Sequence, residues 1–470
     1  MAKTVALPLW LVVTAGLLVV WAMLFKILIP GVRWFFQRRE EIFVRKITRR
    51  LNLRFPAFKF ARKKSIIDRL MSDPEVLKAI DEVSQEQKIP TDAAMKMAES
   101  YAREIVPTFH AYAYFLLGSL LGISLARLLY RVRVGFADEE SLTKLKPHSS
   151  VVFLMNHRSN MDYILLGYLT LSRAALSFAV GEWARVWPIK PLVKAMGAYF
   201  VRRRSGNALY RRVLAGYVQL ATEGGLVQAV YPEGKLSRDG KLHEPKFGIL
   251  DYMLRNFDPG GERDLVFIPA GINYDRVFED RTLLLEAEPG ARKGWKKALF
   301  TTLSFVLHNV WLMIRGGWHR FGYAAVYFGT PVSMQEYARA HDLDFRRIPK
   351  EVRIEHVRRL AGYLFEQVGR AIPALPVSLV SSIFWKNPEA VYSETEIKAR
   401  TQDLMDELEK KGAHVYVPRK DRDYAVQVGL RMLTLRHFVL KEGAGYRASP
   451  REIKILNYYA NSISHLVDAK

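Results

Sequence analysis

The chain has 470 residues, of which 50% are hydrophobic and 25% charged, and it contains no cysteine. This composition excludes wholesale disorder, collagen-like repeats, disulfide frameworks, thiolate metal sites and thiol nucleophiles. The 71 Lys and Arg against 47 Asp and Glu give a formal net charge of +24, which favours an anionic partner such as nucleic acid, anionic lipid or a phosphorylated substrate.

The first predicted element is a membrane anchor. Residues 5–25 form a run of 21 residues without a charge, and a helix of this length covers roughly the 30 Å hydrocarbon core of a bilayer. A cleaved signal peptide is the competing interpretation, but its apolar region is shorter and precedes a small-residue cleavage site, whereas Lys26 and Arg33 follow here. We therefore expect an N-terminal, single-pass transmembrane anchor within residues 1–30.

A basic block follows the anchor. Between Lys26 and Lys64 there are thirteen Lys or Arg and two Glu, whereas only Lys3 precedes the anchor. The positive-inside rule therefore predicts that the part after the anchor lies on the cytoplasmic face. Aromatic residues in this block could stack on nucleic-acid bases, or the block could be a solvated helical face. Beside an anchor, attraction to anionic membrane lipid is the simpler account, and we expect no nucleic acid as partner.

Two further apolar runs interrupt the chain. Residues 106–126 are uncharged, long enough to span, and contain Gly118 and Gly122 at a spacing that suits close helix packing in lipid. A crossing here would place the rest of the chain on the other side of the membrane from the basic block, so we favour a helix that dips into the inner leaflet or packs on the domain that follows. Residues 299–314 number only 16 and include His308, which favours a buried or interfacial helix.

The pattern of apolar and polar residues in the rest of the sequence predicts an α/β protein. Residues 31–130 form a basic and helical membrane-proximal region, with amphipathic helices expected between residues 65 and 103. From residue 131 to about 340, short β-branched or aromatic runs alternate with helical stretches, as in α/β domains. Residues 341–470 form a smaller, mainly helical C-terminal region. The candidate strands are residues 150–155, 176–180, 198–202, 226–231, 266–271 and 323–328.

The sequence NHRSNMDY follows the first candidate strand and separates His157 from Asp162 by four residues. Histidine suits a general base near neutral pH, and Asp162 could bond its far ring nitrogen, fix the tautomer and stabilise the imidazolium. The two side chains would lie roughly 140° apart on a straight helix, so they can meet only across a tight turn, for which Ser159 and Asn160 are suitable. Alone, such a pair is more often a satisfied turn than a catalytic pair. No second His or carboxylate nearby suits a metal site.

Three further blocks lie at the ends of candidate strands. They are GAYFVRRR, with a basic triplet, YPEGKLSRDGK, a glycine-containing polar turn, and VFIPAG, an apolar strand that ends in small residues. Ligands bind at strand ends in open α/β sheets, arginines there can bind phosphate bidentately, and glycines let the backbone approach a ligand. The alternative for each cationic cluster is surface solubility.

Together the four blocks resemble those of the glycerolipid acyltransferase superfamily. Its members carry, in this order, a His-four-Asp block, a Gly-x-x-Phe-x-x-Arg block, a Glu-Gly block with following Ser and Arg, and a Pro-containing apolar block. The form HRSNMDY is most similar to the glycerol-3-phosphate and dihydroxyacetone-phosphate acyltransferase branch, and the likeness extends over residues 65–470. The resemblance implies an acyltransferase-like mixed central sheet flanked by helices.

The resemblance also implies a one-step acyl transfer without a cofactor. His157, oriented by Asp162, would deprotonate the sn-1 hydroxyl of the acceptor, and the alkoxide would attack the thioester of acyl-CoA or an acyl carrier protein. No acyl-enzyme is needed, in agreement with the absence of cysteine and of a Gly-x-Ser-x-Gly elbow. The implied substrate-binding residues are Arg158, Arg202, Arg203 and Arg238 for phosphate, Glu233, Gly234, Lys235 and Ser237 around the acceptor, and Pro269 along the acyl or acceptor channel.

One departure from the branch concerns the acceptor. The Glu-Gly block usually has an arginine two residues after the glycine, and here Leu236 follows Lys235 instead. Lysine is a point cation without the guanidinium fork. The leading hypothesis is therefore a membrane-bound glycerol-3-phosphate 1-O-acyltransferase that forms lysophosphatidate. The alternatives are an acyltransferase on dihydroxyacetone phosphate or lysophosphatidate, and a non-enzymatic scaffold that binds anionic lipid.

Overall fold

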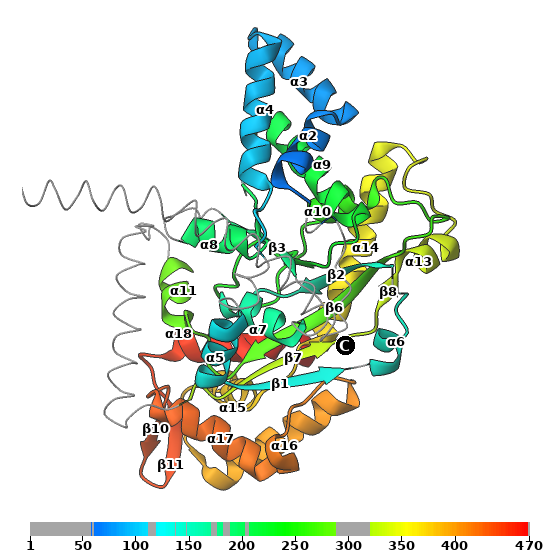
Figure 1. Cartoon of the computed structure of the whole chain (residues 1–470). Helices are drawn as coiled ribbons and strands as arrows, with labels where there is room; N and C mark the ends of the chain where they lie inside the picture. The colour runs from blue at the N-terminus through cyan, green and yellow to red at the C-terminus, as the bar shows by residue number, and fades with distance from the viewer. Residues whose placement is uncertain are drawn as a thin grey trace, which may run out of the picture.

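The fold is built around one central β-sheet with helices on both faces (Figure 1). The computed structural model describes residues 58, 61–110, 119–136, 138–146, 148–170, 176–181, 189–202, 206–287 and 320–468. The expected anchor at residues 5–25, the apolar run at residues 299–314, Arg203 and nearly all of the basic block lie outside these ranges. Within them, no helix combines the length and the apolar character needed to span a bilayer.

The main sheet is mixed. It contains β1 (Arg131–Phe136), β2 (Ser150–Met155), β3 (Ser177–Val180), β4 (Tyr199–Phe200), β5 (Gln228–Val230), β6 (Leu265–Tyr274), β7 (Tyr323–Phe328) and β8 (Val332–Ser333). The strand order is β1-β7-β6-β2-β5-β3-β4, and β8 pairs with β6. All neighbours are parallel except β7 and β8, which run antiparallel to β6. The α/β class and the mixed central sheet are thus confirmed.

All six candidate strands are strands in the structure, and residues 150–155 have the same bounds as β2. The sequence did not point to β1 and β8. β1 lies at the edge of the sheet, and most of its side chains are partly or fully exposed. It therefore lacks the continuous apolar run that marks a strand buried on both faces, such as β6.

Two local features shape the centre of the sheet. Asn156 extends the pairing beyond β2, because its side chain donates to the Ile272 carbonyl at 2.9 Å and accepts the Ile272 N–H at 2.8 Å. Pro269 has no N–H to donate, and it falls between the β8 pairing at Phe267 and the β7 pairing at Ala270. Its carbonyl accepts the Gly329 N–H at 2.8 Å. These contacts fix the end of β2 from which the His-four-Asp block departs.

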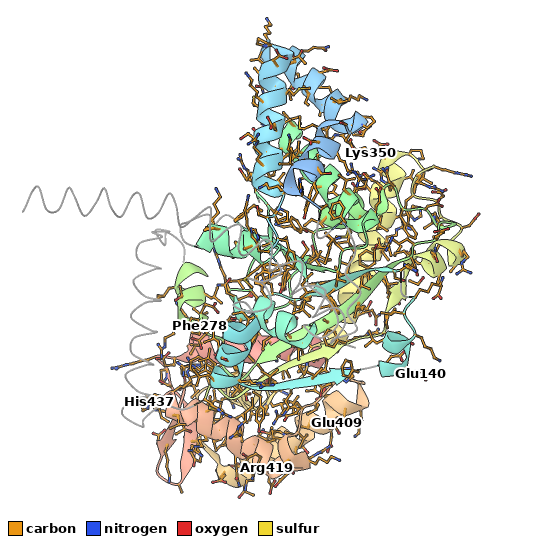
Figure 2. All side chains as sticks on the ribbon, viewed as in Figure 1. Glu140, Phe278, Lys350, Glu409, Arg419 and His437 are labelled. Carbon is orange, nitrogen blue, oxygen red and sulfur yellow. The ribbon has the colours of Figure 1, made fainter. Side chains whose placement is uncertain are left out.

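Side chains alternate between the two faces of the sheet and form one hydrophobic core on each. Charged side chains such as Glu140, Lys350 and Arg419 lie at the periphery (Figure 2). In β2, Phe153 and Met155 belong to one core and Val152 and Leu154 to the other. The helices up to the last sheet strands are α2 (Lys63–Met71), α3 (Pro74–Gln87), α4 (Thr91–Ile105), α5 (Ser119–Leu129), α6 (Glu139–Thr143), α7 (Met161–Thr170), α8 (Ile189–Ala195), α9 (Ala208–Glu223), α10 (Gly248–Leu254) and α11 (Asp280–Ala287).

Helices α2, α3 and α4 are the amphipathic helices expected between residues 65 and 103. They project from the body of the protein and pack on α9 through buried side chains (Figure 1). Asp73 caps α3 by accepting the N–H groups of Glu75 at 2.9 Å and Val76 at 3.1 Å. Of the apolar run at residues 106–126, residues 111–118 lie outside the described part, and the remainder includes the start of α5, which packs on α7.

Residues 341–468 are mainly helical and share a core with the sheet. After α13 (Met334–Ala340), which precedes them, their elements are α14 (Lys350–Ala371), α15 (Pro376–Lys386), β9 (Tyr392–Ser393), α16 (Glu394–Lys410), the 3-10 turn Pro418–Lys420, α17 (Arg422–Leu435), β10 (Val439–Glu442), β11 (Gly445–Ala448), α18 (Ile453–Ala460), the 3-10 turn Asn461–Ile463 and α19 (Ser464–Val467). The small sheet β10-β11-β9 was not anticipated. Helix α14 lies against β2 and β6, and a Cβ on Gly271 of β6 would come within 2.2 Å of the Ala371 backbone.

Candidate active site

The His-four-Asp block forms the tight turn that its spacing required. The turn lies between the end of β2 and the start of α7, and it brings His157 Nδ1 to 2.9 Å from Asp162 Oδ2. Both side chains are buried, with residue exposures of 3% for His157 and 0% for Asp162. Because a carboxylate can only accept, His157 donates through Nδ1, and Nε2 is the ring nitrogen left for a substrate proton.

The Asp162 carboxylate also organises the turn around it. Its Oδ2 accepts the backbone N–H groups of Arg158 at 2.8 Å and Ser159 at 3.1 Å. Its Oδ1 accepts the Tyr274 hydroxyl at 2.5 Å. Burial, together with the negative charge of Asp162, raises the pKa of Tyr274 well above its usual value and keeps this hydroxyl a donor. Asp162 is thus held by four donors and has little freedom to leave His157.

The Glu-Gly block wraps around the backbone of His157. Glu233 accepts the His157 N–H at 2.8 Å and the His243 N–H at 3.2 Å. Burial raises the pKa of Glu233 to about 7, against the opposing effect of these two N–H groups. Ser237 donates its backbone N–H to the His157 carbonyl at 2.9 Å. Gly234, with a φ of +69°, makes the sharp turn between these contacts.

Aromatic rings fix the plane of the imidazole. The Tyr231 ring lies over His157 with centroids 4.2 Å apart and an interplanar angle of 33°. The Tyr163 ring meets His157 edge-on at 5.4 Å, and its hydroxyl donates to the Ala179 carbonyl at 3.2 Å. The imidazole is therefore held by its hydrogen bond to Asp162 and by two aromatic neighbours.

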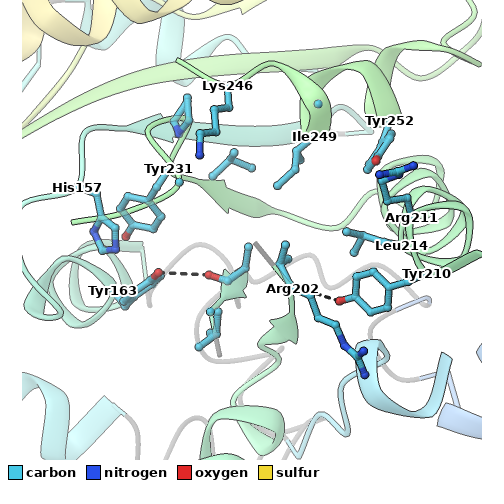
Figure 3. A pocket seen from close by; sticks show the side chains of 18 residues that line it. His157, Tyr163, Arg202, Tyr210, Arg211, Leu214, Tyr231, Lys246, Ile249 and Tyr252 are labelled. Atoms are coloured by element: carbon cyan, nitrogen blue, oxygen red, sulfur yellow. Dashed lines mark hydrogen bonds between the residues drawn. The ribbon is translucent and has the colours of Figure 1, made fainter. Parts of the chain in front are cut away.

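A cavity of about 260 Å³ opens beside His157. Figure 3 shows His157, Tyr163 and Tyr231 at one end and Arg211 and Tyr252 at the other. The walls between are mostly apolar, with three cations among them. The lining residues are the apolar Ala179, Val180, Val201, Leu214, Val230, Pro232 and Ile249, the glycines 181, 234 and 248, the cations Arg202, Arg211 and Lys246, and the aromatic His157, Tyr163, Tyr210, Tyr231 and Tyr252. Such a cavity can hold an apolar chain together with an anionic group.

The predicted phosphate ligands have different surroundings. Arg158 is 3% exposed and does not line the cavity; it donates through Nη1 to the Gly240 carbonyl, and its guanidinium lies 4.7 Å from the Tyr458 ring centroid. Arg202 lines the cavity, but its guanidinium forms a bidentate ion pair with Glu104. Nε lies 3.0 Å and Nη2 2.6 Å from the two carboxylate oxygens. The phosphate roles of both residues stay predictions.

The other predicted residues divide into three groups. Gly234 lines the cavity with His157 and Arg202. Glu233, Ser237 and Asp162 support His157, as described above. Lys235 is exposed and Arg238 partly exposed on the Glu-Gly loop, Pro269 is buried in β6 away from the cavity lining, and Arg203 lies outside the described residues. Over the described ranges, no three His, Asp or Glu side chains gather as in a metal site.

The sequence did not single out Tyr274 or Lys246, or the role of Tyr231 as a ring partner. Tyr274 lies three residues after the VFIPAG block, and Lys246 follows the Glu-Gly block. Both lie far from His157 in the sequence, so their approach depends on strand pairing and loop packing. The only available signal was their proximity to the quoted blocks.

Comparison with known proteins first defines the class. An acyltransferase family model matches residues 134–273, which contain all four blocks. A second model, described as the glycerol-3-phosphate acyltransferase C-terminal region, matches residues 309–468. Residues 134–273 are therefore similar to an acyltransferase domain and residues 309–468 to the C-terminal region of the glycerol-3-phosphate acyltransferases, and the resemblance to that branch is confirmed.

Curated relatives agree with this assignment. The chain is 28% identical to the glycerol-3-phosphate acyltransferase of Alteromonas mediterranea, over 84% of this chain and 48% of the relative. It is 25% identical to that of Pseudomonas savastanoi pv. phaseolicola, over 91% and 52%. The chain thus spans about half the length of the curated relatives it matches. A solved structure of the 1-acyl-sn-glycerophosphate acyltransferase PlsC from Thermotoga maritima matches with 18% identity and a TM-score of 0.30, over 53% of this chain and 78% of that one.

Proposed function

We propose that the protein is a membrane-bound glycerol-3-phosphate 1-O-acyltransferase that forms lysophosphatidate from acyl-CoA or an acylated carrier protein. The observation that carries this proposal is the hydrogen bond between His157 Nδ1 and Asp162 Oδ2 at the edge of a cavity. The relatives share the acceptor in their name, glycerol 3-phosphate. No cofactor takes part in the proposed reaction.

The proposed reaction has one transfer step. Nε2 of His157 accepts the proton of the sn-1 hydroxyl while the oxygen attacks the thioester carbonyl. Asp162 stabilises the imidazolium that forms. When the tetrahedral intermediate collapses, the C–S bond breaks, the thiolate takes the proton from His157, and the products are lysophosphatidate and free thiol. General base catalysis of this kind contributes about 10²–10⁴-fold to a rate.

The cavity suits both substrates of this reaction. Its apolar wall between Val180 and Ile249 suits a hydrocarbon chain, and Lys246 and Arg211 add positive charge on the same surface. We propose that these two cations assist Arg158, Arg202, Arg203, Lys235 and Arg238 in attracting the phosphate groups of the acceptor and of CoA.

We further propose that residues 5–25 anchor the protein and that its catalytic domain faces the cytoplasm. The uncharged run and the basic block behind it support this orientation. The same block gives the protein an attraction to anionic membrane lipid. On this membrane surface, the acyl chains of the donor and of the product would face the bilayer.

Leu236 favours a second candidate acceptor. It replaces the arginine that the branch usually carries, and its side chain packs against the hydrophobic core. Dihydroxyacetone phosphate or lysophosphatidate could therefore be the acceptor of the same reaction. The His157–Asp162 pair argues against an inactive scaffold, because the bond through Nδ1 leaves Nε2 for a substrate and His157 lines the cavity.

The test is acyl transfer by membranes that carry the wild type or His157→Ala. Labelled palmitoyl-CoA or palmitoylated carrier protein is offered with glycerol 3-phosphate, dihydroxyacetone phosphate or lysophosphatidate in separate reactions. We expect histidine-dependent lysophosphatidate formation from glycerol 3-phosphate. Histidine-dependent activity on another acceptor would keep the mechanism and change the acceptor, whereas equal activity of both proteins would overturn the mechanism.

A further inference from the structure

We propose, on the basis of the proposed function, that Glu279 is a positioning residue for acyl transfer, because its carboxylate holds the turn that aligns His157 with Asp162. Glu279 lies in the connection between β6 and α11, far from the His-four-Asp block in the sequence. It neither lines the cavity nor belongs to the four blocks. Its effect on the reaction would therefore pass through the turn.

The contacts of Glu279 converge on the middle of the turn. Oε2 accepts the Ser159 hydroxyl at 2.7 Å. Oε1 accepts the Asn160 backbone N–H at 3.2 Å and the Asn160 side-chain amide at 3.0 Å. Ser159 and Asn160 are the two central residues of the four that separate His157 from Asp162. One side chain thus bonds both residues on which the shape of the turn depends.

The bond to Ser159 continues into the first turn of α7. The Ser159 hydroxyl donates a hydrogen bond to Glu279, so a lone pair of its oxygen is left to accept the Met161 N–H at 3.1 Å. This is a serine turn, in which the hydroxyl accepts the backbone N–H two residues later, and it leads the chain into the helix. Asp162 is the second residue of α7, so its direction toward His157 follows from the direction of this first turn.

A carboxylate at position 279 can hold the turn through hydrogen bonds, which an apolar side chain of similar size could not do. Burial raises the pKa of its carboxyl, and the bonds from Ser159 and Asn160 act against that rise. Placing a carboxylate in such a site has a desolvation cost. A carboxylate is also an acceptor-only group with two oxygens, and here it receives three hydrogen bonds from one turn. The negative charge near the N-terminus of α7 is favourable as well.

Two variants separate the bonding role from the volume of the side chain. Glu279→Leu removes the acceptors, and we expect kcat to fall about 10–100-fold while both KM values stay within about twofold, because the turn is misaligned but the cavity is intact. Glu279→Gln can still accept from Asn160 and can donate to the Ser159 oxygen, so it should restore kcat to within about fivefold of the wild type. Glu262→Leu and Glu262→Gln, at an exposed glutamate, are the matched controls.

A second readout needs no substrate. In protein labelled with ¹⁵N-histidine, the Nδ1–H proton bonded to Asp162 should give a downfield NMR signal, identified by its loss in His157→Ala. Glu279→Leu should shift or broaden this signal, and Glu279→Gln should retain it. If no acceptor is turned over by the wild type, the proposed function fails but the NMR arm still decides the role of Glu279.

The proposal would be overturned in either of two ways. One is a Glu279→Leu protein with wild-type kcat and an unchanged His157 signal. The other is an equal loss of kcat in the Leu and Gln variants, together with raised KM values and a lowered melting temperature in both. That pattern would mean that Glu279 supports the fold and has no specific effect on the turn.

Discussion

Gly240 and Tyr458 pack backbone against backbone, so closely that a Cβ on Gly240 would lie 1.9 Å from the Tyr458 carbonyl oxygen. Gly240 belongs to the Glu-Gly block and Tyr458 to α18 of the C-terminal region. Arg158 joins them, because it donates to the Gly240 carbonyl and lies over the Tyr458 ring. The C-terminal region therefore forms part of the support of the turn between His157 and Asp162.

Gly240→Ala should test this support. The new methyl group would meet the Tyr458 backbone, and the φ of +85° at Gly240 is unfavourable for alanine. We expect the free energy of unfolding to fall by about 1–3 kcal/mol and kcat to fall with it. Gly412→Ala is the matched control, since Gly412 has a φ of +77° but no atom near its Cβ position. Equal loss of stability in both variants would refute a special contact at Gly240.

His157→Ala should abolish transfer without unfolding the protein. Loss of the proposed general base should lower kcat by about 10²–10⁴-fold, and the buried site keeps its remaining contacts to Asp162 through the turn backbone. Initial rates of thioester-dependent acylation, and the denaturant midpoint of the same preparations, are the measurements. If the variant were inactive only because it is unfolded, its denaturant midpoint would fall well below that of the wild type.

Arg202 and Glu104 offer a test of phosphate binding. The Arg202 side chain is 32% exposed and the Glu104 side chain 19%, so in the proposed enzyme Glu104 competes with the acceptor phosphate for the guanidinium. Arg202→Ala should raise the acceptor KM about tenfold, and Glu104→Gln should lower it, each measured at a fixed donor concentration. Unchanged KM values with reduced stability in both variants would contradict a role in phosphate binding. They would show that the ion pair only joins α4 to the segment after β4.

Asp275 predicts a pH dependence of stability. Both of its carboxylate oxygens accept backbone N–H groups, from Tyr323 at 2.8 Å and Val377 at 3.0 Å, and burial raises its pKa to about 7. Because the folded state keeps this proton to a higher pH than the unfolded state, its contribution to stability falls as pH rises from about 4 to about 7 and is then constant.

Asp275→Asn should remove that dependence. The amide leaves one N–H without an acceptor, so we expect a loss of about 1–3 kcal/mol in unfolding free energy. The difference from the wild type should be larger at pH 5 than at pH 8, as measured by urea unfolding at several pH values. A difference that grows between pH 5 and pH 8 would contradict the raised pKa of Asp275.

Elements that depend on a local sequence pattern could be predicted from the sequence. The buried strands β2 and β6 are continuous apolar runs, and the His-four-Asp spacing required the turn that forms between His157 and Asp162. The tertiary partners could not be foreseen in the same way. Tyr274 and Glu279 reach the turn because β6 lies beside β2, and Glu104 reaches Arg202 from a helix far along the chain. Edge strand β1 was missed because most of its side chains face solvent.

The position of Tyr458 in the chain also orders events during synthesis. The ribosome makes Arg158 and Gly240 long before it makes Tyr458. A nascent chain folds from its N-terminal part onward, and closing so long a loop is entropically costly. Until α18 packs against the domain, Arg158 lacks its contact with the Tyr458 ring, and Gly240 lacks its contact with the Tyr458 backbone. The turn between His157 and Asp162 would thus gain its full support only with one of the last helices to be made.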